Sequence, residues 1–120
     1  MEKTVIEADP VRSVDIDDID YTDDLFVVYE GELFTGEAVG YHANGQLRKI
    51  ETYGNGRLRG PERTFHPDGS IKSEYWNVDG ARDGIGRTWY PNGQLESETQ
   101  YDHAKVVLRK RWSEDGTELG

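Results

Sequence analysis

The sequence has no cysteine, few prolines and no long apolar run. Without cysteine there is no disulfide framework, no zinc site with thiolate ligands and no cysteine nucleophile, and this absence agrees with a reducing cytoplasm. No apolar stretch approaches the roughly 18 residues that a membrane-spanning helix needs. The acidic N-terminal part does not have the pattern of a signal peptide. These absences favour a soluble cytoplasmic protein without disulfides.

Hydrophobic residues are also scarce, at 34% of the 120 residues. A length of this order corresponds to one domain. The composition lies close to the range in which chains stay unfolded, so the case for a folded domain depends on the sequence pattern.

The net charge of −10 is concentrated in one part of the chain. Residues 1–32 contain 11 acidic and 2 basic residues, a net charge of −9, and residues 33–120 contain 13 acidic and 12 basic residues, a net charge of −1. A negative field repels phosphates, so direct binding to nucleic acid is not expected and a basic partner is favoured. A segment that only increases solubility is an equally good interpretation.

A pattern of glycines and aromatic residues returns every 24 residues. Three units begin at Gly36, Gly60 and Gly84. A second glycine follows nine residues later, in the tetrapeptides His-Ala-Asn-Gly at 42–45, His-Pro-Asp-Gly at 66–69 and Tyr-Pro-Asn-Gly at 90–93. A degraded fourth copy occupies residues 112–116. Periods of this length are typical of stacked supersecondary units.

The turn chemistry of these units predicts β-hairpins. Proline, then Asp or Asn, then glycine suits a type I turn closed by a left-handed residue with a G1 bulge. We therefore expect paired strands at 37–42 and 46–53, 61–66 and 70–77, and 85–90 and 94–101. Return turns are expected at Asn55-Gly56 and Asp79-Gly80. Residues 25–29 are expected to form a well-buried strand.

The predicted fold class is therefore all-β: an antiparallel β-meander of tandem hairpins in a single elongated, twisted sheet. Residues 1–24 are interpreted as an acidic leader, partly disordered or forming an edge strand. Residues 25–120 are interpreted as the repeat domain with a degraded C-terminal capping repeat. The basic residues at 105–111 favour protection of a terminal strand over a binding patch.

Two sets of residues recur at matching positions of the repeat. We expect an aromatic column with a spacing of about 9.6 Å, and packing within the sheet is a better interpretation of it than stacking on nucleic-acid bases. Its members are Tyr41, Phe65, Trp89 and Trp112. His42 and His66 are expected to form a surface ladder, because their spacing does not suit one shared metal ion.

An acidic run precedes the repeats and contains the candidate partner-binding residues Asp15, Asp17, Asp18, Asp20, Asp23 and Asp24. A calcium loop of the EF-hand type needs glycine at its sixth position and glutamate at its twelfth. Counted from Asp15, those positions hold Asp20 and Phe26, so the loop pattern fails. A solvated acidic segment and a docking patch for a basic protein remain as interpretations.

The motifs Tyr-Glu-Gly-Glu-Leu-Phe-Thr-Gly at 29–36 and Asn-Gly-Gln-Leu at 44–47 and 92–95 resemble the MORN repeat and its variants. The pattern also looks like the bacterial group of YwqK-type antitoxins. The resemblance covers about residues 26–118. It implies an elongated β-meander without catalytic residues, and a role as a scaffold, a lipid-associated module or a toxin-neutralising partner. The acidic run lies outside the resemblance.

We therefore predict a non-enzymatic protein-binding repeat protein without cofactor or metal. An antitoxin or immunity protein that occludes a toxin with a basic surface is the leading hypothesis. The alternative is a structural module for protein assembly or membrane association, although the negative charge does not favour anionic lipid. The polarity of both sheet faces is compatible with a homodimer.

Overall fold

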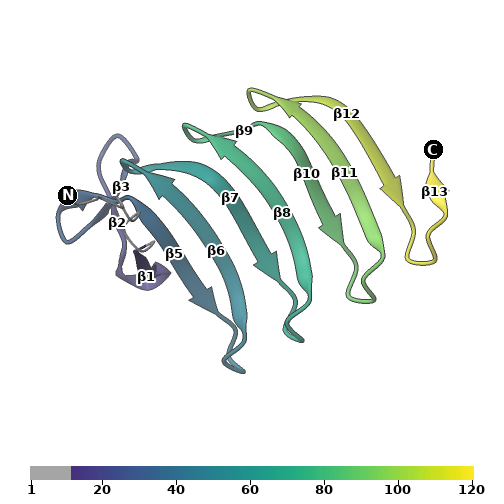
Figure 1. Cartoon of the computed structure of the whole chain (residues 1–120), viewed down its shortest axis with the longest axis horizontal. Coiled ribbons are helices and arrows are strands. Elements are labelled where there is room, and N and C mark those ends of the chain that lie inside the picture. The colour runs from purple at the N-terminus through teal and green to yellow at the C-terminus, as the bar shows by residue number, and fades with distance from the viewer. Residues whose placement is uncertain (1–11) are drawn as a thin grey trace, which may run out of the picture.

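The computed structural model describes residues 12–120 and is almost entirely β-structure (Figure 1). One helix occurs in this range, the short 3-10 helix η1 (Ile16–Asp18), and no helix there is long and apolar enough to cross a bilayer. The predicted all-β meander of tandem hairpins is confirmed. Residues 1–11, where part of the acidic leader was expected to be disordered, lie outside the described range.

A ten-stranded sheet forms the body of the protein. Its strands lie side by side in the order β1 (Ser13–Asp15), β5 (Gly36–Tyr41), β6 (Leu47–Gly54), β7 (Arg57–Phe65), β8 (Ile71–Val78), β10 (Gly84–Trp89), β11 (Leu95–Asp102), β12 (Lys105–Trp112) and β13 (Glu118–Leu119), and β9 (Ala81–Arg82) pairs with β8. Every pairing is antiparallel except that of β1 with β5, which is parallel. The elements follow one another across the sheet because each hairpin is joined to the next by a short turn (Figure 1).

The hairpin turns have the geometry that their sequence predicts. Gly45, Gly69 and Gly93 have φ of 87°, 93° and 88°, in the left-handed region that suits glycine. A register shift adjoins each turn, as a bulge requires. The return turns have two successive residues with positive φ: Asn55 and Gly56, Asp79 and Gly80, and His103 and Ala104. Such pairs match the twist of the flanking strands.

Side chains in the hairpin turns join each unit to the next. The Nε2 atom of His42 lies 2.8 Å from the carbonyl oxygen of Phe65, and that of His66 lies 3.0 Å from the carbonyl oxygen of Trp89. Tyr90 continues the series by donating from its hydroxyl to the carbonyl oxygen of Trp112 at 2.8 Å. The repeat period therefore places a polar side chain against the backbone of the following unit, which fixes the stacking of the hairpins.

The core lies at one end of the sheet, where a three-stranded sheet packs on it. This small sheet consists of β2 (Asp20–Tyr21), β3 (Val27–Tyr29) and β4 (Glu32–Leu33). Its contact with the large sheet buries Val27, Phe34, Ala38 and Tyr53, with at most 6% of each residue exposed. The Phe34 ring lies 6.0 Å from that of Tyr53. Burial of these side chains contributes about 1.5–3 kcal/mol for each large one.

The prediction of a buried strand over residues 25–29 is wrong at its first two residues, Leu25 and Phe26. Leu25 is 77% exposed with a φ of 66°, and β3 begins only at Val27. The reason is a turn in which Leu25 N donates to the carbonyl oxygen of Thr22 and Thr22 N donates to that of Phe26, at 2.9 Å each. The tight turn between β2 and β3 directs the Leu25 side chain outward.

Candidate protein-binding surface

The acidic run is ordered by apolar residues that alternate with its aspartates. Val14, Ile16 and Ile19 are partly buried against the core cluster. All six candidate aspartates are exposed: Asp15, Asp17, Asp18, Asp20, Asp23 and Asp24. The alternation therefore anchors the segment on the sheet through one set of side chains and presents the carboxylates to solvent.

Two of these carboxylates also shape the backbone. Asp15 caps η1, because its Oδ1 atom accepts a hydrogen bond from Asp17 N at 2.8 Å. Asp20 Oδ1 accepts from Tyr21 N at 2.9 Å. Within residues 12–120, none of the six forms an ion pair with a basic side chain. The acidic run thus presents a negative surface that its own sheet does not neutralise.

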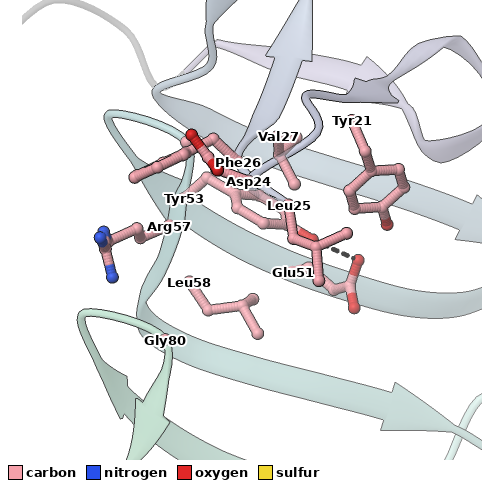
Figure 2. Close-up of a pocket in the computed structure, with 11 residues that line it drawn as sticks. Tyr21, Asp24, Leu25, Phe26, Val27, Glu51, Tyr53, Arg57, Leu58 and Gly80 are labelled. Atoms are coloured by element: carbon pink, nitrogen blue, oxygen red, sulfur yellow. Dashed lines mark hydrogen bonds between the residues drawn. The ribbon is translucent and has the colours of Figure 1, made fainter.

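A pocket of about 330 Å³ lies between the acidic run and the large sheet (Figure 2). Tyr21, Asp24 and Leu25 line it from the side of the small sheet. Glu51 and Leu58, on β6 and β7, line it from the large sheet. The acidic run is therefore continuous with a concave site that has apolar, aromatic and carboxylate groups in its wall.

The polar floor of this pocket is internally paired. Glu51 is 9% exposed, and its Oε1 atom accepts from the Tyr53 hydroxyl at 2.9 Å while its Oε2 atom lies 3.1 Å from Lys49 Nζ. Burial, and then the adjacent Glu51 carboxylate, raise the pKa of Tyr53, so its hydroxyl remains a donor. Glu62 stands opposite Glu51 in register. The charged residues that line the pocket are Asp24, Glu51 and Arg57, so the lining has groups of both signs.

The aromatic residues of the expected column lie at equivalent strand ends but differ in exposure. Tyr41 is 56% exposed, and Phe65, Trp89 and Trp112 are partly buried. Sequence reasoning did not identify the aromatic contacts that the sheet makes elsewhere. The rings of Tyr75 and Tyr101 lie 6.2 Å apart, and the Arg82 guanidinium lies 3.5 Å from the centroid of the Tyr75 ring.

A cluster of Asp83, Asp102 and His103 lies at the turn between β11 and β12. His103 N donates to Asp83 Oδ1 at 3.1 Å, and His103 Nδ1 lies 2.6 Å from Asp102 Oδ1. The hydrogen bond to Asp102 and its charge raise the pKa of His103. Oxygen and nitrogen atoms of these three residues that could bind a metal ion lie within 4.8 Å of one another. The hydrogen bonds of His103 to Asp83 and Asp102 explain why these atoms are close, and they stabilise the turn.

Comparison with known proteins agrees with the geometry of tandem hairpins. The family model described as the MORN repeat variant matches residues 34–55, 58–77 and 82–103, which is 64 of 120 residues (22, 20 and 22). No curated protein and no solved structure matches the chain. MORN repeats are generally modules that bind proteins or membranes, and the family is not enzymatic. With three matched units that coincide with three observed hairpins, the chain belongs to the MORN repeat variant family.

Proposed function

We propose that this protein is a non-enzymatic module that binds a basic protein through its acidic run, in the manner of an antitoxin or immunity protein. The observation that carries the proposal is the outward orientation of all six aspartates, without an ion-pair partner in residues 12–120. A toxin that acts on nucleic acid needs a basic substrate-binding surface, and an acidic surface that covers it blocks access of substrate. Charge complementarity of this kind makes association fast and dependent on salt.

The experiment compares the native chain with Asp17→Asn/Asp18→Asn. Both side chains are exposed, and neither carboxylate accepts a hydrogen bond from the backbone of residues 12–120, so the fold is expected to remain. The matched control is Glu114→Gln/Glu118→Gln, which removes two exposed carboxylates at the opposite end of the sheet. The partner is isolated from the native host with the native chain as bait, and association rates are then measured by stopped-flow fluorescence.

We expect the Asp17→Asn/Asp18→Asn variant to associate about tenfold more slowly at low salt, and the control to associate at the native rate. High salt should remove the difference. Equal rates for the variant and the native chain at low salt would eliminate the acidic surface as the binding site. Growth of cells that express the partner, with and without the native chain, tests the antitoxin role separately.

A scaffolding or membrane-associated module is the second candidate function. It is favoured by the composition of β12, whose eight residues include four basic residues and no acidic residue. Sedimentation with vesicles that contain anionic lipid distinguishes the two candidates. Co-sedimentation that is lost at high salt supports the membrane module, because basic residues bind anionic headgroups electrostatically.

A further inference from the structure

The last long strand of the large sheet has an open outer edge. On its inner side, β12 pairs with β11 from Lys105 to Arg111. On its outer side, β13 pairs only with Arg111 and Trp112. Within residues 12–120, no strand covers the outer side of residues 105–110, and Figure 1 shows β13 beside only one end of β12. The backbone donors and acceptors of this edge are therefore available to another chain.

The open edge exposes apolar side chains as well as charged ones. Val106, Val107 and Leu108 are 52%, 58% and 53% exposed. Exposed apolar residues on an unpaired strand are a template for pairing with a further strand. Basic residues flank these three positions, so the edge is selective in the charge of the strand that it accepts.

The charge of the edge disfavours a second copy of the same strand. Residues 105–112 contain four basic residues and no acidic residue. An antiparallel pair of two β12 strands would bring Lys105 of one copy close to Lys110 of the other, and like charges directly opposite one another are destabilising. An acidic segment from a different protein avoids this repulsion.

A second pocket lies on the face of the sheet, lined by residues of β10, β11, β12 and β13, and it contributes two cations. It has a volume of about 260 Å³, and Arg109, Arg111 and Glu96 are its charged residues. Arg109 and Arg111 stand opposite Thr99 and Ser97, so both lie on the same face of the sheet. Neither guanidinium forms an ion pair within residues 12–120. The pocket therefore has two cations and one carboxylate, and it accepts acidic side chains.

We propose that the outer edge of β12 binds an extended segment of a partner protein in which acidic and apolar residues alternate. Side chains of a strand alternate between faces, so acidic residues of the segment would reach Arg109 and Arg111 while apolar residues would cover Leu108 on the other face. Main-chain hydrogen bonds to the edge supply affinity, and the alternation supplies specificity. This surface is distinct from the acidic run and has the opposite charge.

The experiment uses the full chain and a fluorescein-labelled peptide in which Glu and Val alternate. Hydrogen exchange of the free chain comes first: fast exchange is expected for outward amides of residues 105–110, and protection is expected when the peptide is added. Fluorescence anisotropy then compares this peptide with one of the same composition whose Glu and Val residues form two blocks. Only the alternating peptide is expected to bind.

Charge reversal tests the role of the two arginines. The variant Arg109→Glu/Arg111→Glu should bind the alternating Glu peptide at least tenfold more weakly and should bind a peptide in which Lys and Val alternate. The control Lys72→Glu/Arg48→Glu makes the same charge change at exposed positions of β8 and β6, and it should bind the Glu peptide as the native chain does. Tryptophan fluorescence reports whether each variant is folded.

Three results would overturn the proposal. The first is protection of the outward amides of residues 105–110 in the free chain, which would mean that the edge is already covered or pairs with a second copy. The second is equal affinity for the alternating and blocked peptides, which would leave only unspecific charge attraction. The third is the absence of peptide binding to the folded native chain.

Discussion

Replacement of Gly86 by alanine should destabilise the sheet through one contact. A Cβ atom at this position would lie against the Tyr75 ring, 2.7 Å from Cε1, and 3.2 Å from Tyr101 Cε2. Ordinary contacts of a Cβ atom begin near 3.4 Å, and Tyr75 Cδ1 lies closer to the added atom than Cε1 does, so the Tyr75 ring has to move away. Gly86 does not have a positive φ, so the backbone itself accepts alanine and the effect is steric.

The magnitude follows from two opposing contributions. Overpacking of a well-packed site costs about 1–3 kcal/mol. Alanine in a strand is more favourable than glycine by about 0.5–1 kcal/mol, because glycine loses more conformational freedom on folding. Displacement of the Tyr75 ring also disturbs the stacked Arg82 guanidinium. We therefore expect the free energy of unfolding of Gly86→Ala to fall by about 1–2 kcal/mol.

Urea unfolding followed by tryptophan fluorescence measures this change. The midpoint should fall by about 0.5–1 M without a change in slope, since the surface exposed on unfolding stays the same. Gly54→Ala is the comparison, because its nearest neighbour is the flexible Arg59 side chain at 3.1 Å, and its effect should stay within about 0.5 kcal/mol.

The same substitution in a Tyr75→Ala background separates the steric explanation from others. Without the ring, Gly86→Ala should be neutral or stabilising by about 0.5–1 kcal/mol. A cost of the same size in both backgrounds would refute the contact between Gly86 and Tyr75 as its cause, since coupled residues show non-additive effects.

Three further predictions concern the anchor, the stacking and the pH dependence. Ile16→Asp should lower the free energy of unfolding by about 1–3 kcal/mol in thermal melts, because a charge replaces an apolar side chain that packs on the core. His66→Ala should cost about 1 kcal/mol in urea unfolding, because the carbonyl oxygen of Trp89 loses its bond to the next unit. In an NMR titration, the pKa of His103 should lie above 6.5 and return towards it in Asp102→Asn. Because the folded state raises this pKa, the stabilisation is complete below pH 6.5 and is lost as pH rises through the raised value.

The hairpins were predictable because local turn chemistry determines them. Glycine nine residues after each unit glycine marks a left-handed turn position, and the observed φ values at Gly45, Gly69 and Gly93 follow from that residue type. Five of the six predicted strands begin and end within one residue of where they were expected, and β7 begins at Arg57, four residues before the expected start at residue 61. These features depend on neighbours in sequence, so periodicity was sufficient to find them.

Contacts across the sheet were harder to predict, because they depend on which unit carries which residue. Tyr53 and Tyr101 occupy equivalent positions of the repeat, but Asn77 stands between them and Tyr75 lies two residues before it. Tyr75 and Tyr101 therefore do not occupy equivalent positions of the repeat, and a comparison of equivalent positions does not reveal their contact. The pocket likewise depends on the turn at Leu25, which brings residues of the acidic run over Glu51.

The acidic run and the basic strand β12 lie near opposite ends of the large sheet. Seven strand steps separate β1 from β12, which corresponds to about 34 Å at a spacing of about 4.8 Å. This distance is several times the Debye length of about 8 Å at physiological salt, so the acidic run does not neutralise the basic edge. Asp17→Asn/Asp18→Asn should therefore leave the affinity of the alternating Glu peptide unchanged, as measured by anisotropy. A change in that affinity would show that the acidic run and the β12 edge are coupled, and it would remove the basis for treating them as separate binding surfaces.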